Sequence, residues 1–349
     1  MRYSIPGKAI RRQLHADLIG KDSYRGVTLT YSWLANQFGH FGLGFIPAFI
    51  VYKILVLKFS APTSALWAAI GVSCTWLLFE MFNFLGPLKK HRIKKKVNDE
   101  KGDYTFKPAW FNVAFDTCTD VLFFALGAFI ASLLVHWSIG VLITVISLVA
   151  ALIYPCRYWY VTKLFLQTAQ YPFQFRLSQW NFSLNQEQKK FVHQFVNNQD
   201  KGMHLLLFGA KGSGKTSLGV GIATEHSINH YPCVYTTGIK LYGYFFDDPD
   251  SGNTGDRPLW NWRCCTTLII DDINPGEPIK GDIVSPESFM NLLDTYQGNP
   301  INRDTIKSSN VIWVLGTEIN QQQTALRWKD MLEKELGIDE KRILSLHLK

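Results

Sequence analysis

A glycine-rich loop that ends in lysine and threonine is the strongest chemical pattern in this 349-residue chain. Residues 209–216 read GAKGSGKT, after the apolar residues 205–208 and before a stretch, 217–225, whose composition favours helix. The glycines let backbone N–H groups wrap around phosphate groups, and the N-terminus of the following helix adds partial positive charge. We therefore predict that Lys215 reaches the β- and γ-phosphates of a nucleotide and that Thr216 ligates magnesium. The predicted phosphate-binding residues are Gly209, Ala210, Lys211, Gly212, Ser213, Gly214, Lys215, Thr216 and Ser217.

A second apolar strand ends in two adjacent acidic residues. Residues 266–270 are apolar or β-branched, and Asp271 and Asp272 follow them. A carboxylate in this position can hold the water shell of Mg²⁺, and its neighbour can polarise an attacking water. We predict the first role for Asp271 and the second, catalytic role for Asp272. The alternative is that the glycine loop and the two aspartates are ordinary turns that end core strands.

A third apolar strand, residues 310–316, ends at the hydroxyl of Thr317. We predict that Thr317 orients water or the γ-phosphate between the first two motifs, although it could simply cap its own strand. Two further strands are predicted at 231–237 and 342–348, and helical segments alternate with all of them. This alternation predicts an α/β domain with a parallel five-stranded sheet and helices on both faces.

Residues from about 180 to 349 resemble the AAA+ ATPases, particularly the helicase-loader, replication-initiator and insertion-sequence ATP-binding branch. The resemblance covers about half of the chain and depends on the segments LLLFGAKGSGKTSL, CVYTT, TTLIIDDIN and VIWVLGT. It implies a P-loop ATPase with ATP and Mg²⁺ as cofactors. In that family ATP binds between subunits of an oligomer, and an arginine of the neighbour completes the site; Arg327 is the best candidate and Arg303 the second. The chain ends after the strand at 342–348, so the family's helical lid is expected to be absent.

Residues 184–188 also resemble the glutamine motif of superfamily 1 helicases, in which a glutamine reads the edge of the adenine. The other interpretation is the solvated start of a capped helix, 183–198, that buries Phe191, Val192 and Phe195. No other helicase motif follows in the sequence, which favours the helix.

Four segments of the N-terminal half are long and apolar enough to span a membrane: residues 38–57, 65–85, 117–135 and 139–154. Each approaches the roughly 20 residues that cross a hydrocarbon core of about 30 Å. The last two are joined by a very short turn, so a single re-entrant hairpin is the alternative for them. We predict an all-α transmembrane domain of four helices.

The charge of the chain points to the same arrangement. The formal net charge is +8, and residues 1–156 carry the whole excess. The basic residues gather in the N-terminal tail and in a loop at 86–112, which places both termini and this loop in the cytoplasm of a bacterial-type inner membrane. The loop is expected to touch anionic lipid; nucleic-acid binding is the alternative, and the neutral C-terminal half does not support it. The six cysteines form no CxxC pair, which fits a reducing compartment.

Acidic residues inside the predicted spans need a reason, because burying charge in lipid is costly. Glu80, Asp116 and Asp120 could form a cation or proton site, or a polar clasp between helices. The simpler interpretation is that they cap a helix start or pair with lysines at the membrane surface. His40 of the first span is expected to face the interface rather than to act in chemistry.

The predicted domain organisation is a basic cytoplasmic tail (1–37), a transmembrane domain (38–156), an aromatic juxtamembrane collar (157–182) and an AAA+-like ATPase domain (183–349). The leading hypothesis is an inner-membrane ATPase that remodels or signals to a protein partner that the sequence does not name, as a homo-oligomer in contact with membrane lipids. The second hypothesis is a nucleotide-gated membrane switch that acts in defence or stress. The third is a coupling ATPase for DNA or protein transport, although a neutral domain would grip DNA weakly.

Overall fold

A computed structural model describes residues 3–19, 27–97, 105–197, 202–246, 259–273, 284–293, 300–316 and 321–348, with the side chains of 90–97 and 321–322 excepted. The chain divides into two compact units. One contains Met1–Ile10, Tyr104–Pro108 and Leu164–Lys349, and the other contains Arg11–Asp103 and Ala109–Lys163. Each unit is described by itself.

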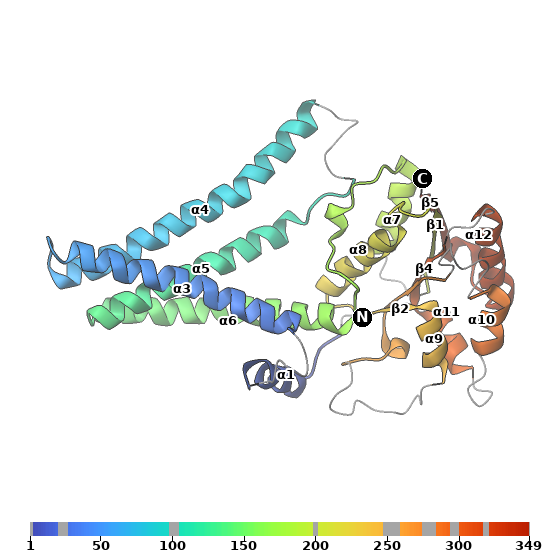
Figure 1. The fold of residues 1–349 in the computed structure, drawn as a ribbon, viewed down its shortest axis with the longest axis horizontal. Helices are drawn as coiled ribbons and strands as arrows, with labels where there is room; N and C mark the ends of the chain where they lie inside the picture. The colour runs from blue at the N-terminus through green and yellow to red at the C-terminus, as the bar shows by residue number, and fades with distance from the viewer. Residues whose placement is uncertain are drawn as a thin grey trace. The chain divides into compact units, whose positions relative to one another are not determined.

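Long apolar helices dominate the second unit. After the short helix α1 (Gly7–Ile19), four helices of the described chain are long and apolar enough to cross a membrane, as predicted. They are α3 (Leu29–Leu55), α4 (Ala61–Val97), α5 (Trp110–Val135) and α6 (Ile139–Thr168) (Figure 1). Helices α5 and α6 each have 26 residues or more, so each is long enough to span a membrane alone.

The helices extend beyond the predicted spans. The first begins at Leu29, where the Thr28 side chain accepts a hydrogen bond from the Tyr31 N–H and caps it. Helix α4 continues to Val97 through part of the predicted basic loop, and residues 157–168 of the predicted collar are the last turns of α6. Hydropathy identifies only the apolar middle of such a helix, whereas extension by one polar residue adds a backbone hydrogen bond at little cost.

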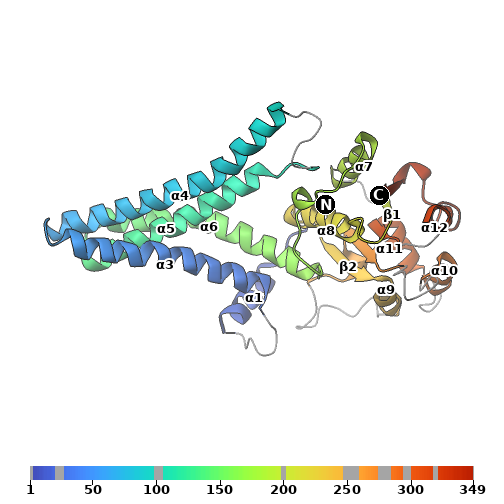
Figure 2. The same ribbon diagram turned by 45° about the horizontal axis from the view of Figure 1, so that its top comes forward.

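Helices α3 and α5 pack backbone against backbone, and both views show them side by side (Figures 1 and 2). A Cβ atom on Gly44 would strike the carbonyl oxygen of Phe124, and one on Gly127 would strike that of Phe41. Small residues at a crossing allow this close approach in membrane helices.

The same crossing joins two of the ionisable residues noted in the sequence. Nδ1 of His40 lies 2.9 Å from Oδ1 of Asp120, and each side chain is only 17% exposed. The register of α3 on α5 thus turns His40 towards a carboxylate of the neighbouring helix, a contact that the sequence analysis did not predict. Asp116 interacts electrostatically with Asp120, Lys163, His40 and Glu80.

The first unit contains the predicted parallel sheet of five strands, in the order β2-β3-β4-β1-β5. The strands are β1 (His204–Gly209), β2 (Cys233–Thr237), β3 (Thr267–Asp271), β4 (Asn310–Val314) and β5 (Ile343–Leu348). Helix α7 (Gln186–Asn197) precedes β1, and the helices after β1 include α8 (Lys215–Ile228), α9 (Gly238–Phe245), α10 (Pro286–Leu293), α11 (Ile301–Ser308) and α12 (Gln321–Asp330).

Helices cover both faces of this sheet. Leu205 and Leu207 of β1 pack in one core with Val192 of α7 and Leu218 of α8. On the opposite face, Trp313 of β4 packs against Phe289 of α10 and Trp328 of α12, with ring centroids 5.3 and 5.2 Å apart. The alternation of side chains along each strand thus buries the sheet in two layers of helix.

Candidate nucleotide-binding site

The glycine loop connects β1 to α8 in a shape that only glycine adopts easily. Gly212 and Gly214 have φ angles of 83° and 82°, in the left-handed region. Gly209 has a φ of 147°, and a Cβ atom there would strike the carbonyl oxygen of Leu348 on β5. The loop therefore turns tightly from the sheet into the N-terminus of α8.

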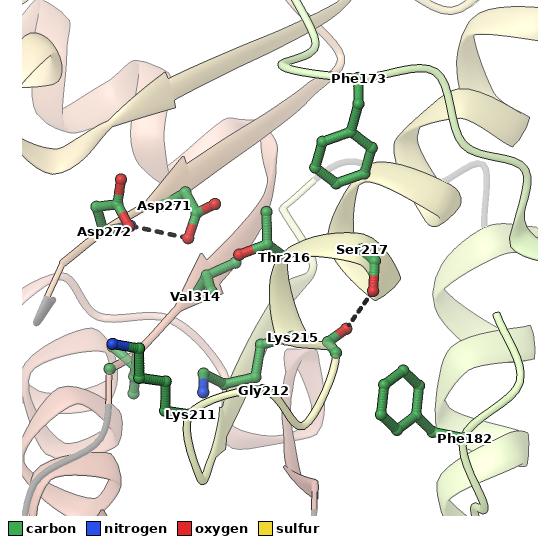
Figure 3. Close-up of a pocket in the computed structure, with 13 residues that line it drawn as sticks. Phe173, Phe182, Lys211, Gly212, Lys215, Thr216, Ser217, Asp271, Asp272 and Val314 are labelled. Carbon is green, nitrogen blue, oxygen red and sulfur yellow. Dashed lines mark hydrogen bonds between the residues drawn. The ribbon is translucent and has the colours of Figure 1, made fainter. Parts of the chain in front are cut away.

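A cavity of about 460 Å³ opens at this turn, at the carboxyl ends of β1, β3 and β4 (Figure 3). Its size lies within the range of pockets that hold small ligands. Its lining residues are Phe173, Phe182, Lys211, Gly212, Gly214, Lys215, Thr216, Ser217, Asp271, Asp272, Val314, Leu315 and Gly316. The cavity thus brings the two predicted motifs together. Of the predicted loop residues, Gly209, Ala210 and Ser213 are described but do not line it.

The ammonium group of Lys215 lies over its own loop. Nζ donates hydrogen bonds to the carbonyl oxygens of Gly209 and Ala210, both at 2.9 Å. Burial lowers the pKa of Lys215, and the nearby carboxylate of Asp271 opposes this shift. The lysine is therefore held beside the phosphate-binding glycines by contacts that an anion could replace.

Asp271 is buried, with 3% of its surface exposed, and both of its carboxylate oxygens accept hydrogen bonds. Oδ1 accepts the backbone N–H of Asp272 at 2.8 Å, and Oδ2 accepts the hydroxyl of Tyr235 at 2.8 Å. These contacts fix the plane of the carboxylate at the edge of the cavity (Figure 3).

Asp272 is exposed and has a φ of 51°, which is uncommon for a residue other than glycine. Backbone conformations of this kind are costly and gather at functional sites. Desolvation and the charge of Asp271 raise the pKa of Asp272, so its carboxylate is a stronger base than an ordinary aspartate.

Tyr235 is a site residue that the sequence analysis did not identify. It lies on β2 and reaches Asp271 on the adjacent strand, where desolvation and the Asp271 charge raise the pKa of its hydroxyl. It therefore remains a hydrogen-bond donor to Asp271. The segment CVYTT was noted in the sequence only as a predicted strand, and nothing in it indicated this contact.

Strand β4 lies between β1 and β3, so its end lies between the glycine loop and the acidic pair. Val314, Leu315 and Gly316 line the cavity there, and the next residue is Thr317, which lies outside the described residues.

The candidate arginines lie elsewhere. Nη2 of Arg327 is 3.0 Å from Oε2 of Glu287, and Nη1 of Arg303 donates to the Glu335 carbonyl oxygen at 3.0 Å. Within the described chain, neither arginine lines the cavity.

The second half of the predicted collar runs along α8. Nε1 of Trp180 donates to the carbonyl oxygen of Gly214 at 3.0 Å, and Nε of Arg176 lies 2.9 Å from Oε1 of Glu225. The hydroxyls of Tyr171 and Ser227 are 2.8 Å apart. These contacts bring two collar aromatics, Phe173 and Phe182, to the cavity, which no spacing in the sequence had indicated.

The glutamine-motif residues cap a helix instead. Asn185 Oδ1 accepts the N–H of Gln188 at 2.8 Å, Gln188 Oε1 accepts the N–H of Asn185 at 3.0 Å, and Gln188 Nε2 donates to the His347 carbonyl oxygen at 2.7 Å. This is a capping box at the start of α7, as the helix interpretation predicted. Residues 184–188 are all described, and none of them lines the cavity.

Magnesium would need ligands from the nucleotide. Among the described residues, no group of three or more His, Cys, Asp or Glu side chains could hold a metal ion. Thr216 and Asp271 both line the cavity, and Mg²⁺ in nucleotide sites takes one or two protein ligands together with phosphate oxygens and water. The residues present fit that coordination.

No protein-family model matches the chain, and no curated protein matches it.

Proposed function

We propose that the chain is a membrane-anchored, magnesium-dependent ATPase. Its α/β unit binds and hydrolyses ATP, and the four apolar helices hold it in a bacterial-type inner membrane with both termini in the cytoplasm. One observation carries the proposal: Lys215, Thr216, Asp271 and Asp272, from two motifs far apart in the sequence, line one cavity at the carboxyl ends of parallel strands. Ligands of α/β proteins bind at this edge of the sheet.

The glycine loop supplies phosphate binding. Its N–H groups and the N-terminus of α8 attract anions, and Lys215 exchanges its two carbonyl partners for phosphate oxygens. An ammonium–phosphate contact is charge-assisted and is therefore stronger than the bonds that it replaces.

Asp271 and Asp272 have different roles in this proposal. Asp271, oriented by Tyr235 and by its own neighbour, holds water molecules of the magnesium shell, while Thr216 provides a hydroxyl ligand. Each carboxylate oxygen has a second lone pair, so the bonds that orient Asp271 leave room for these waters. Asp272, with its raised pKa, accepts a proton from the water that attacks the γ-phosphate. The magnesium ion neutralises charge on the phosphates when it is bound.

The surface of the long helices supports the membrane assignment. Large apolar side chains that are more than half exposed include Phe38, Ile46 and Ile54 on α3, Trp67 and Phe82 on α4, and Ile143 and Ile153 on α6. A soluble monomer rarely exposes so much apolar surface, whereas lipid would cover it.

The nucleotide-gated switch remains the second candidate, because Trp180 of the collar donates a hydrogen bond to Gly214 of the glycine loop. Turnover separates the two functions. A remodelling ATPase hydrolyses ATP steadily, and a switch hydrolyses it slowly until a trigger arrives. Oligomerisation and a protein partner are part of both proposals.

Calorimetry of the full-length protein in detergent tests the ATP site. Lys215→Ala should lower ATP affinity by at least about tenfold, because it removes the charge that pairs with the phosphates. Lys240→Ala is the matched control, since Lys240 is exposed on α9 and does not line the cavity. Equal ATP affinity in Lys215→Ala and the parent protein would overturn the assignment.

A further inference from the structure

Two aromatic rings form one wall of the cavity, and the proposed phosphate chemistry does not use them. Phe173 and Phe182 are 41% and 37% exposed, so both rings remain partly accessible where they line the cavity. Figure 3 shows both rings on the α8 side of the glycine loop, with Asp271 and Asp272 on the other side.

The ring of Phe182 is held against the glycine loop. A Cβ atom on Gly214 would lie 2.7 Å from this ring, so the third glycine of the loop leaves space for it. Trp180 supports the ring from behind, with centroids 5.1 Å apart, and itself donates to the carbonyl oxygen of Gly214. An exposed ring in a fixed position next to a phosphate-binding loop is suited to stacking on a flat ligand.

The same segment is tied to the chain that precedes α5. The hydroxyl of Thr105 donates to the carbonyl oxygen of Phe182 at 2.7 Å. The next residue, Phe106, is 2% exposed, and its ring lies 6.0 Å from that of Trp180 and 5.6 Å from that of His193. Residues 105–108 lead directly into α5, which begins at Trp110.

From this geometry we infer that Phe173 and Phe182 bind the base of the nucleotide by stacking, and that base binding steadies residues 105–108 through the Thr105–Phe182 contact. The inference rests on the proposed function and adds the part of the ligand that this wall recognises. The phosphates lie on the glycine loop near Asp271, and the base extends past Ser217 to the two rings. Because aromatic faces stack on any base, purines bind more tightly than pyrimidines through their larger area, and adenine and guanine are poorly distinguished.

The test compares ATP with inorganic tripolyphosphate, which carries the phosphates without a base. Calorimetry is performed with Mg²⁺ on the full-length protein in detergent. The parent protein should bind ATP more tightly than tripolyphosphate. Phe182→Leu should lower ATP affinity about tenfold and leave tripolyphosphate affinity unchanged, while Phe182→Trp should retain ATP binding. Phe246→Leu is the matched control, because Phe246 is 55% exposed and lies outside the cavity lining.

Lys215→Ala separates a failure of this inference from a failure of the proposed function. If that variant binds both ligands like the parent, the phosphate site itself is wrong. If it loses both ligands but Phe182→Leu binds ATP like the parent, only the base-stacking wall is wrong.

Hydrogen exchange of the parent protein tests the link to α5. ATP should slow amide exchange in residues 105–107 and 173–182, and tripolyphosphate should not. Equal protection by the two ligands, or no protection of 105–107 by ATP, would overturn the link. Thr105→Val should remove the ATP-dependent protection of 105–107 while Phe182 still binds the base.

Discussion

The hydroxyl of Tyr235 donates a hydrogen bond to Oδ2 of Asp271 at 2.8 Å, across the adjacent strands β2 and β3. The backbone N–H of Asp272 occupies the other carboxylate oxygen. Asp271 is therefore held in one orientation by two donors before any ligand arrives. In the proposed magnesium site, these two donors would set how well the carboxylate of Asp271 is placed.

We expect Tyr235→Phe to weaken magnesium use rather than nucleotide binding itself. Removing the hydroxyl frees Asp271 to rotate, so the Mg²⁺ concentration for half-maximal turnover should rise by roughly tenfold or more. ATP affinity measured without Mg²⁺ should stay at the parent value. Tyr231→Phe, in the same unit but outside the cavity lining, serves as the control. An unchanged Mg²⁺ dependence in Tyr235→Phe would show that the contact has no role at the site.

Asp272→Asn separates binding from hydrolysis. The amide keeps the size of the side chain but cannot accept a proton from water, so turnover should fall by about 10²-fold or more. ATP affinity should change little, because the phosphates are bound by the glycine loop and Lys215. Steady-state hydrolysis and calorimetry on the same preparation measure the two effects. Parent-like turnover in Asp272→Asn would exclude this residue as the base.

Local patterns in the sequence predicted a large part of this fold. The five strands were found from apolar runs, and the glycine loop from fixed spacing, because both signals lie within a few neighbouring residues. The position of β4 between β1 and β3 was expected only through the role predicted for Thr317, since strand order depends on packing between distant segments and not on local patterns. The contacts of Tyr235 with Asp271 and of His40 with Asp120 are non-local for the same reason.

The aromatic collar shows what the composition of a segment does not predict. Its composition suggested burial against both the membrane surface and the ATPase domain. Its second half packs on α8, with Leu177 and Trp180 buried at 6% and 1% exposure in the core of the α/β unit. Composition identifies aromatic residues that need burial, but it does not say against which surface they are buried.

A buried histidine makes the stability of the α/β unit dependent on pH. His204 on β1 is 0% exposed, and its Nδ1 accepts a hydrogen bond from Nε1 of Trp313 at 3.1 Å. Burial lowers its pKa from 6.5 to about 3. Between these values the unfolded chain binds a proton that the folded chain excludes, so stability falls as the pH falls from about 6.5 towards 3.

We expect His204 to contribute a loss of about 2 kcal/mol in unfolding free energy between pH 7 and pH 5. The measurement is denaturant unfolding of the full-length protein in detergent, monitored by tryptophan fluorescence. His204→Gln does not titrate in this range and should flatten the dependence. A parent protein as stable at pH 5 as at pH 7, with the variant indistinguishable from it, would contradict the prediction.

Arg327 offers a test of whether the site is completed by a second subunit. If it acts on a neighbour's nucleotide, Arg327→Ala should lower turnover by about 10²-fold or more and leave ATP affinity unchanged. Glu287→Ala is the matched control, because it breaks the same exposed ion pair and leaves the arginine in place. Mixing Arg327→Ala with Lys215→Ala subunits should restore part of the turnover. In some of the mixed interfaces, the intact nucleotide site of an Arg327→Ala subunit faces the intact Arg327 of a Lys215→Ala subunit. An equal loss of turnover in Arg327→Ala and Glu287→Ala would show that the arginine has only a structural role.

Membrane topology is the last prediction, and it follows from the basic residues. The N-terminal tail and the predicted loop at 86–112 contain fourteen Lys and Arg residues, while the short connections at 56–60 and 136–138 contain only Lys58. The positive-inside rule therefore places Ser60, between α3 and α4, outside the cell, and Asn98, which lies outside the described residues, in the cytoplasm.

Single cysteines at these two positions, in a background without the six native cysteines, should be labelled from outside only at Ser60→Cys. Both should be labelled after the membrane is made permeable, which confirms that each site is reactive. Labelling of Asn98→Cys alone in intact cells would invert the whole arrangement and place the ATP site outside, where it would have no ATP to bind.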